Sequence, residues 1–255
     1  MMERNIRLLI AYDGSRYQGW QRQKEAPTLQ GTIEAVLNRI TQESISLKGA
    51  GRTDAGVHAW GQVANFKTSA LLPLSKLESA FQALLPRDIL IREILEVDSG
   101  FHARFSSQAK VYDYFITCRK PQSPFIRRYV WSIKEPLSLP RIRTGLLLLK
   151  GEKDFSSFQT AGSPVFQTVR TIQQADLLAA PWGTFRLRFK ADGFLRHMVR
   201  NMVGLLIRLG LGRLSLEEFA GVIAAKDRSK TGAMAPAQGL FLRKVIYPKT
   251  GSGPL

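Results

Sequence analysis

The stretch ISLKGAGRTDAGVHAWGQVANFK, residues 45–67, carries two apolar segments on either side of a glycine-rich loop. Residues 45–49 and 61–67 have the apolar, partly alternating pattern typical of short strands. Gly49, Gly51 and Gly56 lie in or beside the connecting loop, and glycine permits tight turns and close approach of a ligand. The stretch therefore predicts two strands joined by a loop that a ligand can reach.

The rest of the first half surrounds this strand pair with regular elements. Residues 6–12 are expected to form a buried strand, and Thr28 to cap a helix that runs to about residue 41. A second helix carries Leu74 to Leu85 and ends at Pro86, and a strand follows at 89–97. The order βαββαβ is that of the ferredoxin-like motif.

The second half shows the same order of elements without a clear sequence repeat. Strands are expected at 110–118, 169–179, 184–191 and 240–247, with a helix after Ser138, a helix at 194–210, and a short helix begun by the capping box of Ser215 and Glu218. The fold class is therefore α+β: two ferredoxin-like halves with antiparallel sheets side by side, helices on one face, and an active-site cleft between the halves. The expected domains are 1–105 and 106–250, with a frayed tail at 251–255.

The charge of the chain indicates a polyanionic partner. Lys and Arg outnumber Asp and Glu by 37 to 20, a formal net charge of +17. Phosphate neutralisation by such side chains releases counterions and drives binding to nucleic acid. A basic protein that charge merely keeps soluble is the alternative.

The same inventory argues against several other classes. Cys118 is the one cysteine, so no intrachain disulfide can form, and with three histidines it cannot make a Cys/His zinc cluster at a usual spacing. The start of the chain resembles neither a signal peptide nor a membrane span. We therefore expect a cytoplasmic protein without a metal.

Asp54 stands at the centre of the glycine-rich loop. The loop is not a dinucleotide fingerprint, since Asp54 occupies the place of the third glycine, and it lacks the G-K-[ST] of a P-loop. An Asp in such a loop is more often a turn former or cap than a nucleophile. Local sequence alone leaves both roles open.

Motifs along nearly the whole chain resemble the tRNA pseudouridine synthase A family. They are YDGSRYQGWQRQ at 12–23, GRTDAGVHAWGQVANF at 51–66, LLPRDI at 84–89, FHARFSSQAKVYDYFI at 101–116, DFSSFQ at 154–159, VRTI at 169–172, ADGFLRHMVRNMVG at 191–204 and APAQGLFLRKVIYP at 235–248. The resemblance implies an isomerase that converts uridine to pseudouridine at positions 38, 39 and 40 of the tRNA anticodon stem-loop. It implies a homodimer, tRNA as the partner, no membrane and no small-molecule cofactor.

The resemblance also assigns roles to four residues. The catalytic nucleophile falls on Asp54, its neighbouring arginine on Arg52, the tyrosine that packs on the target base on Tyr112, and the basic partner of the aspartate on Arg200. The match departs just before Tyr112, where Lys110 and Val111 replace a more basic pair. That puts a backbone contact in doubt and leaves the chemistry unaffected.

Several of these residues have structural alternatives. Arg196, Arg200 and Arg208 recur with Gly204 at steps of four, which is also typical of a solvated helix face. Tyr112 and Tyr114 can both be core residues, and His58, His102 and His197 are interpreted as structural or phosphate-contacting. Tyr12, Asp13, Tyr17 and Trp20 fit either an RNA-contacting loop or a packed one. A relative with another RNA target, and a non-catalytic RNA-binding module, are the rival functions.

Overall fold

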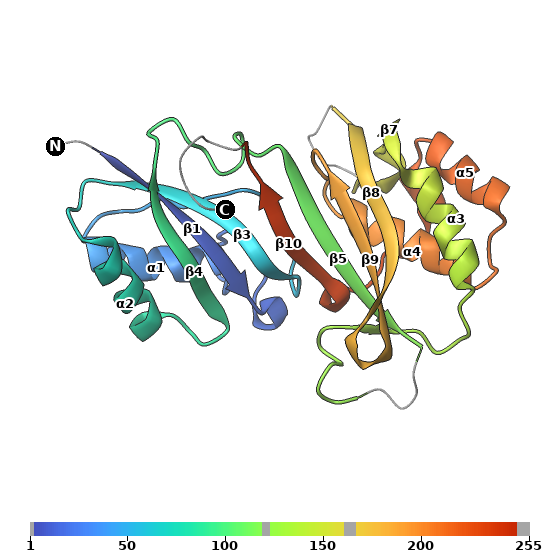
Figure 1. The fold of residues 1–255 in the computed structure, drawn as a ribbon, viewed down its shortest axis with the longest axis horizontal. Coiled ribbons are helices and arrows are strands. Elements are labelled where there is room, and N and C mark those ends of the chain that lie inside the picture. Colours follow the sequence, from blue (N-terminus) through green and yellow to red (C-terminus); the bar gives the residue numbers. More distant parts are fainter. Residues whose placement is uncertain (1–2, 119–122, 161–166, 249–255) are drawn as a thin grey trace. The chain divides into compact units, whose positions relative to one another are not determined.

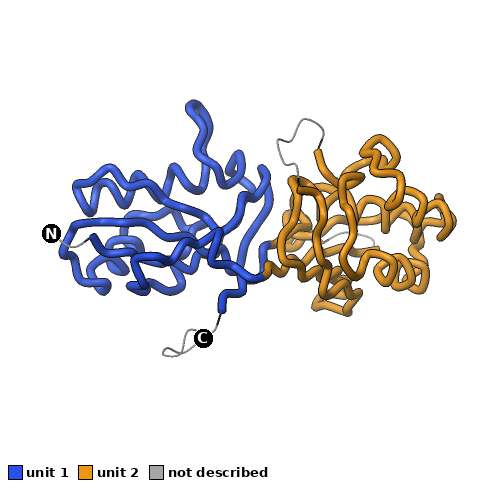
Figure 2. Tube along the Cα trace, turned by 90° about the horizontal axis from the view of Figure 1, so that it is seen from above, with its two compact units in different colours: residues 1–108, 242–255 blue, residues 109–241 orange. Residues whose placement is uncertain are grey.

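A computed structural model describes residues 3–118, 123–160 and 167–248. The chain divides into two compact units, residues 1–108 with 242–255 and residues 109–241, which Figure 2 colours separately. The expected frayed tail at 251–255 lies outside the described residues. Each unit is described by itself below.

The first unit is an antiparallel sheet covered by two helices. Its elements are β1 (Arg4–Tyr12), α1 (Leu29–Thr41), β2 (Lys48–Gly49), β3 (His58–Thr68), α2 (Leu74–Leu84), β4 (Ile89–Val97) and, from Leu242 on, β10 (Leu240–Ile246). The strand order is β4-β1-β3-β10, and β2 pairs with β3. The βαββαβ order predicted for this half is confirmed.

Alternation along the strands explains the core of this unit. Ile6, Leu8 and Ile10 of β1 are fully buried, while the residues between them are more exposed. One face of the sheet thus carries the apolar side chains, and α1 and α2 lie against it (Figure 1). The Thr28 side chain caps α1 by accepting a hydrogen bond from the Gly31 amide at 3.3 Å, as its position predicted.

The second unit contains four antiparallel strands, one short parallel strand and three α-helices. Its elements are β5 (Ala109–Thr117), β6 (Trp131–Ser132), α3 (Leu139–Leu149), β7 (Gly151–Asp154), β8 (Val169–Ala180), β9 (Thr184–Ala191), α4 (Met198–Gly210) and α5 (Leu216–Ala224). The strand order is β5-β9-β8-β7, and β6 runs parallel to β5. Leu187 and Phe189 of β9 are fully buried, and they alternate with the partly exposed Arg186, Arg188 and Lys190. The predicted α+β class is therefore confirmed, and the strands of the chain belong to one large, mainly antiparallel sheet.

Three expected elements differ in extent. The helix expected at 194–210 begins only at Met198, because His197 adopts a left-handed conformation with φ 64°. The strand expected at 45–49 shrinks to Lys48–Gly49, whereas β3 starts three residues early, at His58. The short strands β6 and β7 were not predicted; neither has enough residues to show an alternation.

Candidate active site

Asp54 lies at the middle of the loop between β2 and β3, and it is half-buried. The Val57 amide donates a hydrogen bond to the Asp54 carbonyl oxygen at 3.2 Å, which closes a turn over Ala55 and Gly56. Gly56 has φ +74°, a conformation that favours glycine. The backbone around Asp54 is therefore a defined turn, and the need for glycine that the sequence suggested holds at Gly56.

A second segment, residues 13–20, holds this loop from its other side. The Trp20 amide donates to the Thr53 carbonyl oxygen at 3.0 Å, and the Gly56 amide donates to the Tyr17 carbonyl oxygen at 3.3 Å. The Tyr12 and Thr53 hydroxyls lie 2.8 Å apart. Thr53, which precedes the turn, and Gly56, which lies within it, are thus both bonded to segment 13–20. Thr53 is also bonded to Tyr12 at the end of β1.

The aromatic residues of segment 12–20 are packed. Tyr12, Tyr17 and Trp20 are 5%, 6% and 2% exposed, so they are core residues and do not form an open RNA-contacting loop. The Tyr17 hydroxyl donates to Asp88 at 2.7 Å. Burial, together with Asp88, raises the pKa of Tyr17 well above its usual value. These side chains therefore support the Asp54 loop.

His58 has the structural position that its sequence context suggested. It is 1% exposed at the start of β3. Its Nδ1 lies 3.1 Å from the Gly14 amide nitrogen and 3.1 Å from Asp13 Oδ1. One tautomer accepts from the amide and the other donates to the carboxylate. Either bond ties the end of the Asp54 loop to the turn at residues 13–16.

Arg52 lies on the surface of the same loop. Its side chain is exposed, and its Nε donates a hydrogen bond to Gln21 Oε1 at 2.8 Å. Gln21 follows Trp20, which binds the loop backbone at Thr53. Arg52 and Asp54 therefore belong to one loop. The neighbouring residues Trp20 and Gln21 bind that loop, at Thr53 and at Arg52.

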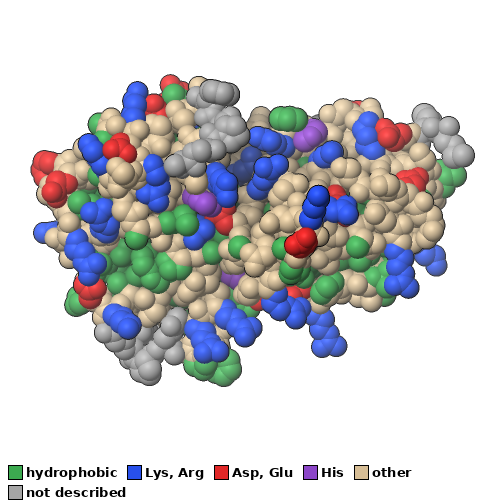
Figure 3. All heavy atoms as spheres, turned by 180° about the vertical axis from the view of Figure 1, so that it is seen from behind, with side chains coloured by type: hydrophobic (Ala, Val, Ile, Leu, Met, Phe, Trp, Pro, Cys, Tyr) green, Lys and Arg blue, Asp and Glu red, His purple; other side chains and the backbone are tan. Residues whose placement is uncertain are grey.

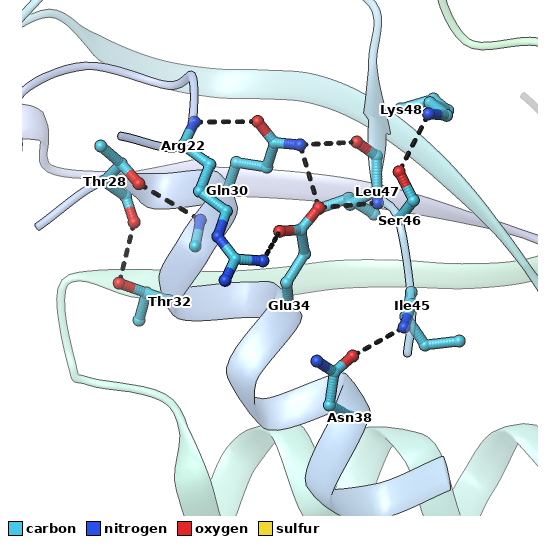
Figure 4. A network of polar contacts seen from close by, with 11 residues as sticks. Arg22, Thr28, Gln30, Thr32, Glu34, Asn38, Ile45, Ser46, Leu47 and Lys48 are labelled. Carbon is cyan, nitrogen blue, oxygen red and sulfur yellow. Dashed lines mark hydrogen bonds and ion pairs between the residues drawn. The ribbon is translucent and has the colours of Figure 1, made fainter. Parts of the chain in front are cut away.

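A buried polar network connects the segment that carries Trp20 and Gln21 to α1 (Figure 4). Glu34 is 3% exposed and its Oε1 accepts from the Gln30 side chain and the Leu47 amide, each at 2.9 Å. Gln30 also accepts from the Arg22 amide at 3.0 Å, and Arg22 Nη1 lies 3.3 Å from Glu34 Oε2. The network thus connects α1, the residues before β2 and the segment that carries Trp20 and Gln21.

Sequence reasoning missed Gln30 and Glu34. The sequence does contain a detectable feature. Gln30 and Glu34 lie four residues apart, on the same side of α1 as the apolar Ile33. Polar residues in that position require hydrogen-bond partners, because an unpaired buried polar group is costly.

Tyr112 lies in the second unit, on β5. It is 7% exposed and pairs with Phe189 of β9 in the sheet. Its ring meets that of Phe194 edge-on, with centroids 5.1 Å apart. Two strand positions later, Tyr114 is fully buried and its hydroxyl donates to the Pro236 carbonyl oxygen at 2.8 Å. The Tyr112 side chain is thus largely buried with a small exposed part, and Tyr114 is a core residue.

Arg200 lies on α4 and contacts the segment that precedes β10. Its Nε donates to the Ala235 carbonyl oxygen at 2.9 Å, and the Ala235 amide donates back to the Arg200 carbonyl oxygen at 3.1 Å. Burial raises the pKa of Tyr114 far above its usual value, and the positive charge of Arg200 opposes that rise. Arg200 therefore lies beside both Tyr114 and residue 235.

The stripe at steps of four on α4 is only partly what the sequence suggested. A Cβ at Gly204 would lie 2.3 Å from the Ala233 carbonyl oxygen, and Arg208 donates to the Thr231 carbonyl oxygen at 3.2 Å. This face therefore packs on residues 231–235 and is not a solvated face. Arg196 is exposed and precedes the helix, so its expected place on the stripe is wrong.

Comparison with known proteins gives the family directly. A model of the tRNA pseudouridine synthase family matches residues 8–106 and 147–248, which include both Asp54 and Arg200. The chain belongs to the tRNA pseudouridine synthase family. It is 42% identical over 245 residues to tRNA pseudouridine synthase A of Thermoanaerobacter sp. strain X514, covering 96% of this chain and all of the relative. The enzyme of the same name from Moorella thermoacetica is 44% identical, covering 95% of this chain and 99% of the relative.

The predicted family and enzyme class are thereby confirmed: this pseudouridine synthase is an isomerase of uridine in tRNA. Blue Lys and Arg side chains outnumber red acidic ones on the face drawn in Figure 3, in keeping with a polyanionic substrate. None of the helices in the described part of the chain combines the length and the apolar character that a membrane span requires.

Proposed function

We propose that this enzyme isomerises uridines at positions 38, 39 and 40 in the anticodon stem-loop of tRNA, with Asp54 as the nucleophile. The observation that carries the proposal is the fixed backbone of Asp54. Hydrogen bonds from Trp20 to Thr53 and from Gly56 to Tyr17 hold the turn, and the half-buried Asp54 is its first residue. A catalytic group needs such preorganisation, because small displacements of a reacting group are costly in rate.

The reaction breaks the N1–C1′ bond of uridine and joins C1′ to C5 of the same uracil. The proton on C5 is lost and N1 regains one, so the product is an isomer of the substrate. An ionised carboxylate can attack the sugar C1′, attack C6 of the ring, or move a proton in a glycal-type route. All three routes need Asp54 charged, and Arg200, as its proposed basic partner, would favour the charged form.

Three further residues complete the proposed site. A uridine inside a stem cannot be reached, so it must leave the stack. Arg52, two residues before Asp54, is proposed to fill the gap or to hold the adjacent phosphate. Tyr112 is proposed to pack on the detached uracil, and Arg200 to pair with Asp54. Domain 1–105 would supply Asp54 and Arg52, and domain 106–250 would supply Tyr112 and Arg200.

The setting of the reaction is proposed on the same basis. The enzyme works as a homodimer in the cytoplasm, on tRNA, without a cofactor. Because it acts at three positions in different sequences, it recognises the shape and backbone of the anticodon arm more than base edges.

The decisive experiment maps pseudouridine in tRNA from cells that lack this protein and then restores the wild type or Asp54→Asn. Loss at positions 38–40, recovery with the wild type and none with Asp54→Asn is expected. Asp98→Asn is the matched control, because its side chain can still accept the hydrogen bond from the Gly100 amide at 2.8 Å. Asp54→Asn protein should retain tRNA affinity within a few fold. Multiple turnover by that variant would refute the nucleophile, and loss at other positions would refute the target.

A further inference from the structure

The turn at residues 101–107 presents an aromatic side chain to solvent from a tightly bonded backbone. Phe105 is 75% exposed, although the backbone two residues before it is buried. A single exposed apolar residue on a protein surface needs no explanation. Phe105 differs from such a residue because hydrogen bonds and ring contacts hold its backbone and its side chain in place.

Buried polar groups of the first unit anchor the turn. Asn65 Oδ1 accepts from the Ala103 amide at 2.8 Å, and the Tyr247 hydroxyl donates to the Ala103 carbonyl oxygen at 2.6 Å. The Asn5 side chain donates to the Phe101 carbonyl oxygen at 2.9 Å. Asn5 and Asn65 are 2% and 4% exposed and bond to each other at 2.9 Å. The base of the turn is therefore part of the protein core.

The outer part of the turn is ordered by His102. Its Nδ1 accepts from the Arg104 amide at 3.1 Å and from the Phe105 amide at 3.4 Å. The His102 ring lies against the Phe105 ring, with centroids 4.4 Å apart, and the Arg104 guanidinium carbon lies 5.6 Å from the same ring. His102 thus fixes both the backbone and the ring of Phe105. A solvent-exposed aromatic ring is held in place with an exposed arginine beside it.

This turn lies at the far end of the sheet from Asp54. Asn65 follows His58 by seven positions on β3, which is roughly 23 Å at about 3.3 Å per residue. The Asp54 loop adjoins His58, and the turn is anchored at Asn65. The Phe105 turn and the His58 end of the Asp54 loop are therefore held at well-separated positions along β3.

We propose that Phe105 and Arg104 form a second RNA contact, in which Phe105 stacks on an unstacked base of the tRNA and Arg104 binds the neighbouring phosphate. Every base has a face that can stack on an aromatic ring, and a basic chain with a net charge of +17 already attracts the backbone. The contact rests on the proposed function in one respect, that tRNA is the substrate. It positions the tRNA and takes no part in the chemistry.

The test measures tRNA affinity and its salt dependence for two variants. Phe105→Ala should weaken binding about five- to tenfold, the loss of one base stack, with an unchanged slope of log affinity against log salt. Arg104→Ala should weaken binding and also reduce the slope by about 0.7–0.9, the value of one phosphate contact. Phe105→Trp should retain wild-type affinity. In steady-state assays Phe105→Ala should raise KM and leave kcat unchanged.

Leu71→Ala is the matched control, because Leu71 is an equally exposed apolar residue, 80% exposed, in the same unit. It should change neither affinity nor slope. Wild-type tRNA affinity for Phe105→Ala would overturn the proposal. If that variant also had an altered sedimentation coefficient, the turn would be a contact between copies of the chain. Failure of the proposed anticodon activity would instead appear in the wild type itself, as absent isomerisation at positions 38–40.

Discussion

The Trp20 amide donates a hydrogen bond to the carbonyl oxygen of Thr53, the residue before Asp54, over 3.0 Å. Trp20 is 2% exposed, so this bond transmits the position of a core residue to the backbone of the proposed nucleophile. Trp20, for which the sequence left an RNA contact and a packed loop open, is packed and would act on the proposed chemistry through the backbone. Variants in segment 13–20 should change rate without touching substrate.

Gly19→Ala tests this support. Gly19 has φ +92°, and a Cβ there would lie 2.6 Å from the Thr53 carbonyl oxygen. The strain of a non-glycine residue in this conformation is of order 1–3 kcal/mol, and the clash falls on the loop of the proposed nucleophile. We expect kcat to fall tenfold or more while the tRNA dissociation constant changes by less than a few fold.

The control for Gly19→Ala is Gly221→Ala, in α5. A Cβ at Gly221 meets nothing within 4 Å, and alanine favours a helix by about 0.5–1 kcal/mol. That variant should keep full activity and unfold at the same or a slightly higher temperature. A wild-type kcat for Gly19→Ala would show that the loop does not depend on this contact.

Glu34→Gln tests the buried network of Figure 4. A glutamine can still accept from the Leu47 amide, but its NH₂ group would face Arg22 Nη1, a donor. Leaving buried groups unpaired costs about 1–3 kcal/mol. The free energy of unfolding should fall by that order, and kcat should fall because Trp20 and Gln21 lose part of their support. Urea unfolding and single-turnover rates measure the two effects.

The pair of Arg4 and Glu96 provides the comparison for Glu34, because its carboxylate lies at the surface. These side chains are 2.8 Å apart and Glu96 is half exposed. Glu96→Gln should leave both stability and kcat close to wild type, because water replaces a lost surface partner. Equal effects of the two substitutions would mean that the network has no particular role in positioning the loop.

The fold was more predictable than the supports of the site. The strand at 89–97 and the helix capped by Thr28 followed from periodicity and capping, which are local properties. His197 was not predictable, because the left-handed conformation that ends the expected helix early is not specified by a histidine. The bond from Trp20 to Thr53 joins residues 33 positions apart, and no local pattern encodes it. Asp54 and Arg200 were identified from family resemblance; their catalytic roles stay predictions.

Arg200→Ala is expected to reduce the single-turnover rate at saturating enzyme by tenfold or more, with a small effect on tRNA affinity. The guanidinium is held by the Ala235 carbonyl oxygen and is proposed to pair with the nucleophile. Arg200→Lys should restore the rate only in part, because lysine lacks the planar fork of donors. Arg208→Ala is the control on the same helix face: it loses the bond to Thr231 and should affect stability more than rate.

Asp154 should make folding stability sensitive to acid. Burial disfavours its ionised form, but hydrogen bonds from Thr168 and Ser156 and the contact with Lys226 outweigh burial and lower the pKa to about 2. Because this pKa lies below the usual 3.8, the ionised group stabilises the folded state above about pH 4, and the contribution is lost as pH falls toward 2. Asp154→Asn should therefore be less stable than wild type at pH 6, with a difference that vanishes near pH 2. Glu152→Gln, an exposed change on the same strand, should show no such difference, and a constant gap for Asp154→Asn across this range would contradict the assignment.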